Sequence, residues 1–116
     1  MHELSLVAGL FEILEEKARD EEALRVTAVT LRVGKLSGVV PELLETAFET
    51  YKKGTIASRA KLCVEHIPLK VRCRSCGKET LADEPVFACS SCASQGLEIM
   101  EGQEVTLYRM EIEKDG

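Results

Sequence analysis

The chain has 116 residues, of which 45% are hydrophobic and 30% charged, and its formal net charge is −5. This length predicts one domain, or one small domain that carries a metal-held insertion. No apolar run reaches the length of a membrane span, and the first residues lack the basic and apolar regions of a secretory signal. We therefore expect a cytoplasmic protein with no membrane contact, and the acidic charge argues against general nucleic-acid binding.

Hydrophobic periodicity predicts a helix over residues 4–20. Its apolar positions recur at intervals of three and four residues, at Leu4, Val7, Ala8, Phe11, Leu14 and Ala18. Residues 25–33 then alternate, with Val29, Leu31 and Val33 on one side. This alternation predicts a half-buried strand that Gly34 ends.

A second helix is predicted to begin at Pro41, which suits the first helical position, with Glu42 and Glu45 near its positive end. Gly54 ends it. Its inner stripe consists of Leu44, Ala47, Phe48 and Tyr51.

Two further strands are predicted, at residues 61–67 and 104–112. In the first, Leu62 and Val64 share a face, and Pro68 marks the exit from the ladder. In the second, the alternation slips at Tyr108 and Arg109, which indicates a bulge.

This order of elements predicts an α+β fold: two helices packed on a small three-stranded mixed sheet, with a zinc-ribbon-like insertion before the last strand. We expect residues 1–69 and 101–116 to form the α+β domain and residues 70–100 to form a zinc-binding domain.

Two Cys-x-x-Cys pairs, separated by twelve residues, lie in that insertion: Cys73 with Cys76, and Cys89 with Cys92. This spacing is typical of a four-thiolate zinc site, in which each pair forms a tight turn called a knuckle. Gly77 follows the first pair and is able to take a positive φ, so that backbone N–H groups turn toward the sulfurs.

Two disulfides, or a redox dithiol, are the alternatives to zinc. Two matched pairs without a secretory signal favour the metal. Because four sulfurs fill every coordination position, this zinc is expected to be structural and not catalytic. Residues 78–86 are polar, so we expect that segment to be disordered without metal.

The remaining candidate site is His2. The Met1 amine, the His2 backbone nitrogen and the imidazole Nδ1 are able to chelate one ion. The Glu3 backbone nitrogen is able to complete a square, or the Glu3 carboxylate is able to bind or to form a hydrogen bond nearby. Planar nitrogen ligands suit Ni(II) or Cu(II). From its position alone, however, His2 is more simply a solvated terminal residue.

No catalytic machinery is evident elsewhere. Ser37 lacks a histidine partner, and no phosphate-binding loop is present. We expect Cys63 to be a buried structural thiol and His66 to be a packed or surface residue. Between Lys70 and Met100, four basic and four acidic residues form no basic stripe for nucleic acid.

Several of these features together resemble the HypA/HybF family of nickel-insertion accessory proteins of [NiFe]-hydrogenase maturation. The chain opens Met1-His2-Glu3-Leu4-Ser5-Leu6, Gly34 ends the first strand, Pro41-Glu42-Leu43-Leu44 opens the second helix, and the paired knuckles follow. The resemblance covers essentially the whole chain. One departure is visible: many members have a proline inside the second Cys-x-x-Cys and a glycine after it, where this chain has Ser90-Ser91 and Ala93.

The resemblance implies a nickel metallochaperone that is not an enzyme. His2 would be the principal nickel ligand, with the Met1 amine and the Glu3 backbone, and Ni(II) would be transient cargo. Cys73, Cys76, Cys89 and Cys92 would hold structural Zn(II). The implied partners are a nickel-handling maturation GTPase and the hydrogenase large-subunit precursor, and some members also serve urease accessory proteins.

Two rival functions come from other classes. One is a zinc-ribbon module for protein interaction or nucleic-acid binding, with an inert N-terminus. The other is a thiol oxidoreductase that uses one cysteine pair.

Overall fold

The computed structural model describes residues 3–115, and it divides into two compact units. The first contains the described residues up to Leu31, together with Val39–Glu65 and the described residues from Thr106 on. The second contains Arg32–Gly38 and His66–Val105.

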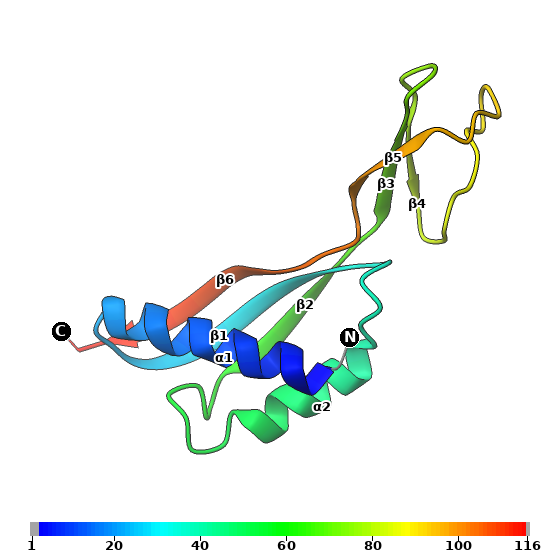
Figure 1. The fold of residues 1–116 in the computed structure, drawn as a ribbon. Coiled ribbons are helices and arrows are strands. Elements are labelled where there is room, and N and C mark those ends of the chain that lie inside the picture. Colours follow the sequence, from blue (N-terminus) through cyan, green and yellow to red (C-terminus); the bar gives the residue numbers. More distant parts are fainter. Residues whose placement is uncertain (1–2, 116) are drawn as a thin grey trace. The chain divides into compact units, whose positions relative to one another are not determined.

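The first unit is built from two helices and a three-stranded sheet (Figure 1). The helices are α1 (Glu3–Asp20) and α2 (Pro41–Tyr51), and the strands are β1 (Ala23–Gly34), β2 (Lys61–Ile67) and β6 (Val105–Lys114). The strand order is β2-β1-β6. Strands β1 and β2 run in the same direction and β6 runs in the opposite one, so the sheet is mixed, as predicted (Figure 1).

One hydrophobic core joins the helices to this sheet. Phe11 is 2% exposed, and its ring centroid lies 5.4 Å from that of Phe48 and 5.1 Å from that of Tyr51. Each such aromatic pair contributes about 0.5–1.5 kcal/mol beyond area burial. Tyr51 itself remains 40% exposed. Besides Phe11 and Phe48, the buried side chains of the first unit are Val7, Leu10, Leu14, Ala18, Val26, Val29, Leu31, Leu44, Ala57 and Ala60.

Two predictions about burial are wrong. Leu4 is 57% exposed, because it lies in the first turn of α1. Cys63 is exposed, because it alternates along β2 with Leu62 and Val64, which turn toward the core.

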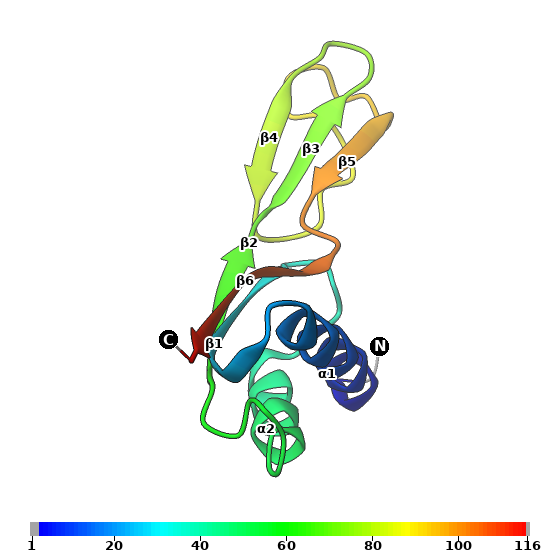
Figure 2. The same ribbon diagram turned by 90° about the vertical axis from the view of Figure 1, so that its left-hand side faces the viewer.

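The second unit contains a sheet that the sequence analysis did not predict (Figure 2). Its strands are β3 (Leu69–Cys73), β4 (Glu79–Ala82) and β5 (Leu97–Glu101), in the antiparallel order β4-β3-β5. Strand β4 lies within the polar segment 78–86, for which no secondary structure was predicted.

The two faces of this second sheet differ in chemistry. Val71 pairs with Thr80 on β4 and with Ile99 on β5, and this face carries the buried side chains Leu69 and Val71. The opposite face carries two ion pairs: Arg72 donates to Glu98 at 2.8 Å, and Lys70 lies 3.3 Å from Glu79.

Close backbone packing joins the segments at the base of the second unit. A Cβ added to Gly34 would lie 2.3 Å from the carbonyl carbon and oxygen of Gly102. The Gly34 N–H donates to the Glu104 carbonyl at 2.9 Å, and the Leu36 N–H donates to the Gly102 carbonyl at 2.8 Å. Gly34 therefore has a steric reason to lack a side chain.

We expect Gly34→Ala to lower the free energy of unfolding by about 1–3 kcal/mol, because the neighbouring backbone must move. Urea denaturation of the metal-loaded protein measures the change. The matched control is Gly9→Ala in α1, where an added Cβ meets nothing within 4 Å. That substitution should stabilise the helix by about 0.5–1 kcal/mol. Equal midpoints for wild type and Gly34→Ala would contradict the packing argument.

Candidate metal centre

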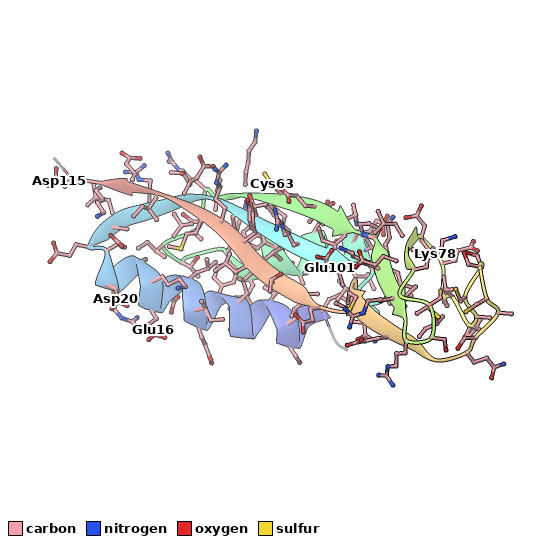
Figure 3. All side chains as sticks on the ribbon, turned by 90° about the horizontal axis from the view of Figure 1, so that it is seen from above. Glu16, Asp20, Cys63, Lys78, Glu101 and Asp115 are labelled. Carbon is pink, nitrogen blue, oxygen red and sulfur yellow. The ribbon has the colours of Figure 1, made fainter. Side chains whose placement is uncertain are left out.

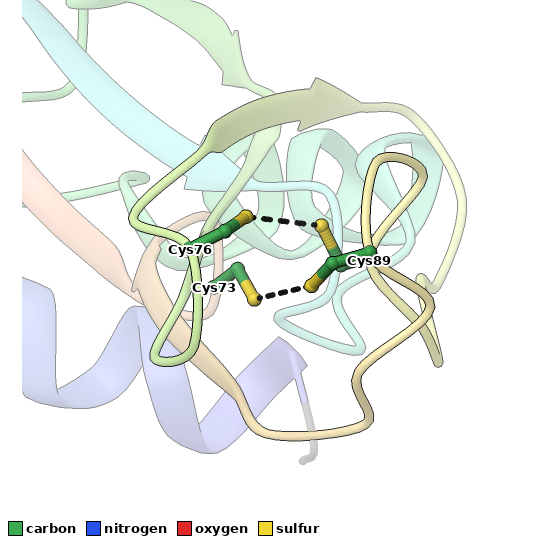
Figure 4. A group of neighbouring side chains, drawn as sticks. Cys73, Cys76 and Cys89 are labelled. Carbon is green, nitrogen blue, oxygen red and sulfur yellow. Dashed lines mark hydrogen bonds between the residues drawn. The ribbon is translucent and has the colours of Figure 1, made fainter.

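Four cysteine sulfurs meet at the tip of the second unit (Figure 4). The Sγ atoms of Cys73 and Cys92 are 3.5 Å apart, and those of Cys76 and Cys89 are 3.6 Å apart. All four sulfurs lie within 4.8 Å of one another. None is in a disulfide, in which the sulfurs would be about 2.05 Å apart.

The two knuckles have the same backbone hydrogen bonds. The Gly77 N–H donates to the Cys73 carbonyl at 2.8 Å, and the Ala93 N–H donates to the Cys89 carbonyl at 2.9 Å. Similarly, the Cys73 N–H donates to the Lys78 carbonyl, and the Cys89 N–H donates to the Ser94 carbonyl. Both residues after the second cysteine have positive φ, 77° at Gly77 and 60° at Ala93. The second knuckle thus adopts this geometry without a glycine.

Backbone N–H groups directed at sulfur lower the pKa of one thiol in each knuckle. The Cys76 N–H lowers the pKa of Cys73 to about 6, with a further contribution from Ser75. The N–H groups of Cys92 and Ser91 likewise lower the pKa of Cys89. These two sulfurs are therefore favoured as thiolates, the form that binds metal.

Cys92 shifts in the opposite direction. The Ser94 N–H favours its thiolate, but this is outweighed by the Cys73, Cys89 and Cys76 sulfurs and by burial, which together raise the pKa of Cys92 to about 12. Hydrogen bonds to these neighbouring sulfurs favour the protonated Cys92 thiol, so a metal ion that binds all four sulfurs must displace that proton.

Polar contacts outside the sulfur cluster also join the two knuckles. The Ser75 hydroxyl donates to the Ser94 hydroxyl at 3.0 Å, and Lys78 Nζ donates to the Ser90 hydroxyl at 3.1 Å. Arg74 N–H donates to the Gly96 carbonyl at 2.9 Å. The knuckles are thus held in register by their backbone and by surface side chains.

The donor set fits a tetrahedral ion. A zinc ion with Zn–S bonds of about 2.3 Å separates its sulfur ligands by about 3.8 Å. The Cys73–Cys92 and Cys76–Cys89 sulfur distances of 3.5 Å and 3.6 Å are close to this value. Cys73 and Cys89 are buried whereas Cys76 and Cys92 are exposed. The cluster therefore offers four sulfur ligands that fit one metal ion such as zinc, with two of the four residues exposed to solvent.

The predicted nickel ligands Met1 and His2 lie outside the described residues. Glu3 begins α1, and its Oε2 accepts a hydrogen bond of 3.2 Å from the Val40 N–H at the N-cap of α2. Because Phe11 of α1 also meets Phe48 of α2, the two helices run in the same direction with their N-terminal ends adjacent (Figure 1).

Sequence reasoning missed two features of these sites. The contact of Glu3 with Val40 joins residues 37 positions apart and has no local signal. The positive φ of Ala93 was hidden by its residue type, although its position matches that of Gly77. The two other candidates, Cys63 and His66, are both exposed and lie outside the cysteine cluster, and the side chain of Cys63 is labelled in Figure 3.

No helix within residues 3–115 combines the length and apolarity needed to cross a membrane.

Comparison with known proteins identifies the family. Residues 1–112 match the family model described as "Hydrogenase/urease nickel incorporation, metallochaperone, hypA". The hydrogenase maturation factor HypA of Aquifex aeolicus is 44% identical over 115 residues, which cover 99% of this chain and 100% of that protein. HypA of Shewanella oneidensis is 40% identical over 114 residues, 98% of this chain and 97% of that protein.

Solved structures agree with this assignment. The solution structure of the Ni metallochaperone HypA from Helicobacter pylori matches with a TM-score of 0.75 and 26% identity, covering 99% of this chain and 100% of that chain. A second solution structure of a HypA protein matches with a TM-score of 0.77 and 26% identity, covering 99% and 98%. The chain belongs to the HypA family of hydrogenase maturation factors.

Proposed function

We propose that this chain is a nickel metallochaperone for [NiFe]-hydrogenase maturation, which binds Ni(II) through Met1, His2 and Glu3. The observation that carries the proposal is that the match to the nickel-incorporation family begins at residue 1 and therefore includes all three residues. Nickel is cargo here, so the site must be accessible for transfer.

The surroundings of Glu3 support this nickel site. The Glu3 carboxylate accepts the Val40 N–H, and this contact holds Glu3 at the start of α1, where its backbone nitrogen is the proposed donor to the ion. The positive ends of two parallel helices meet here and would disfavour a bare cation. Two deprotonated amide ligands would cancel the charge of Ni²⁺, so the bound ion would no longer be repelled by the positive helix ends.

Zinc is the metal we assign to the four cysteines, with a structural role. Bound zinc would supply folding free energy and fix the knuckles, because no coordination position is left for water or substrate. We propose that the first unit is the nickel-binding domain and the second unit is the zinc-binding domain. The protein then has no catalytic residues, which fits a carrier.

The proposed partners are the nickel-handling maturation GTPase and the hydrogenase large-subunit precursor, in the cytoplasm; urease accessory proteins are further candidates. An apolar surface at the nickel end of the helices supports docking of a partner. Leu4, Val40 and Leu43 are 57%, 44% and 53% exposed there. The alternative, a zinc-ribbon interaction module with an inert N-terminus, predicts no specific nickel binding.

Nickel titration separates these two functions. We expect untagged, zinc-loaded protein to bind one Ni(II) per chain, measured by calorimetry and by the absorbance of square-planar nickel. Binding should weaken as the pH falls, because the amine (pKa about 7.7–8.0) and the imidazole (pKa about 6.5) must both lose protons.

The matched variant is His2→Ala, which removes the imidazole and leaves the zinc cysteines unchanged. It should retain zinc and lose nickel, and a residue added before Met1 should have a similar effect because it removes the free amine. Equal nickel binding by wild type and His2→Ala would refute the proposed site.

Zinc removal tests the structural role. In a ¹⁵N–¹H spectrum, we expect chelation to collapse the signals of residues 70–100, because structural zinc contributes about 10–16 kcal/mol of folding free energy in zinc-finger peptides. Signals of α1 and α2 should persist, since their core contains no metal ligand. Metal analysis should confirm that the chelated protein lacks zinc. If the signals of residues 70–100 are still fully dispersed in that protein, the knuckles fold without zinc.

The positive φ of Ala93 predicts that Ala93→Gly stabilises the zinc-bound unit. Left-handed backbone costs an ordinary residue about 1–2 kcal/mol, and glycine loses about 0.5–1 kcal/mol more entropy on folding, so a net gain of about 0.5–1 kcal/mol is expected.

Gly77→Ala is the reciprocal control. An added Cβ there meets nothing within 4 Å, so the substitution tests the backbone conformation alone and should destabilise by a similar amount. Thermal unfolding of zinc-loaded variants measures both changes. If Ala93→Gly and Gly77→Ala shifted the unfolding temperature in the same direction, the matched geometry of the two knuckles would be contradicted.

A further inference from the structure

The apolar face of the β4-β3-β5 sheet is incompletely covered by the chain. A cavity of about 320 Å³ opens on this face, bordered by Leu36, Leu69, Val71, Val86, Phe87 and Ile99. No charged side chain lines it. Its volume lies at the lower end of the range of about 300–1,000 Å³ found for ligand pockets.

Phe87 borders this cavity but does not fill it, since the side chain is 80% exposed. Ile99 on the same rim is 42% exposed. Burial of a phenylalanine side chain is worth about 1.5–3 kcal/mol, so a phenylalanine held in water beside an open apolar cavity marks a surface suited to covering by another molecule.

The size of the surface argues against a second copy of this chain as the occupant. Two phenylalanines buried across a two-fold axis supply about 300–500 Å² of contact, well below the 1,200 Å² or so of a stable interface. A short peptide segment, by contrast, needs one anchored side chain and a few polar contacts.

The charges beside the cavity indicate which residues flank the anchoring side chain in such a peptide. Asp83 and Glu84 immediately precede the cavity wall at Pro85, and both are exposed. Among residues 3–115 neither has an ion-pair partner, whereas Glu79 and Glu98, on the opposite face of the sheet, are paired with Lys70 and Arg72. Asp83 and Glu84 therefore place exposed negative charge, without an ion-pair partner in the described part of the chain, next to the cavity wall at Pro85.

From these observations we propose that the second unit carries a peptide-docking site. The peptide inserts one aromatic or large aliphatic side chain beside Phe87 and Ile99 and places lysine or arginine side chains near Asp83 and Glu84. This site is separate from the metal ligands and does not rest on the nickel proposal. It would allow a target protein to be held through the zinc-binding unit.

The test uses zinc-loaded full-length protein and a fluorescein-labelled peptide with one phenylalanine between two pairs of lysines. Anisotropy measures binding, and ¹⁵N–¹H spectra locate it. We expect the largest shifts at Val71, Phe87, Leu97 and Ile99. A control peptide with alanine in place of phenylalanine should bind at least about tenfold more weakly. A control with glutamates in place of the lysines should also bind more weakly.

Three protein variants complete the test. Phe87→Ala and Ile99→Glu should each weaken binding by about tenfold while zinc content and nickel binding stay unchanged. Leu81→Glu is the matched control: Leu81 is 65% exposed but pairs with Lys70 on the charged face, so its substitution should leave peptide binding intact.

Three outcomes would overturn the proposal. They are spectral shifts elsewhere, equal binding of the phenylalanine and alanine peptides, and concentration-dependent self-association in sedimentation that Phe87→Ala abolishes. The last of these would assign the cavity to a second copy of the chain.

Discussion

The second unit depends on bringing four sulfur atoms from two separate loops to one point. The sulfurs of the two pairs lie 3.5 Å and 3.6 Å apart, and hydrogen bonds between the sulfurs raise the pKa of Cys92. Four thiolates at this spacing would repel one another. The sheet β4-β3-β5, the matched N–H···O bonds of the knuckles and the contact of Ser75 with Ser94 all act to hold the loops against that repulsion. A divalent cation bound by all four sulfurs would offset this repulsion and contribute folding free energy to the unit.

The two metal sites have opposite requirements: one must retain its ion and the other must release it. Four protein ligands enclose the cysteine site, so an ion there is retained. The proposed nickel site takes its ligands from the first three residues, with His2 as the principal one, and has a supporting contact from Glu3 to Val40. Nitrogen donors at a chain terminus can dissociate one at a time, which suits an ion that must be passed on. Copper would bind such donors more tightly, so selectivity has to come from the partner that delivers or accepts the ion.

Much of the fold was predictable because its elements follow simple periods. The alternation of Val29, Leu31 and Val33 and the stripe from Val7 to Ala18 are both found in the core. Strand β4 was not predictable, since its four residues carry no apolar alternation and it is held by pairing with β3. The cysteine cluster followed from spacing, whereas the positive φ of Ala93 is imposed by that cluster on a residue that does not favour it.

Each unit exposes a group of apolar side chains, so one unit is able to hold a target protein while the other transfers the nickel ion. One group, Leu4, Val40 and Leu43, lies at the helix ends of the first unit, and another, Phe87 and Ile99, lies at the cavity of the second. A carrier with a single docking surface must release its partner whenever the contact at the metal is broken. If each unit holds its own contact, the one at the zinc-binding unit keeps the effective concentration of the partner high while the nickel ligands exchange. Weak contacts are then sufficient at both places.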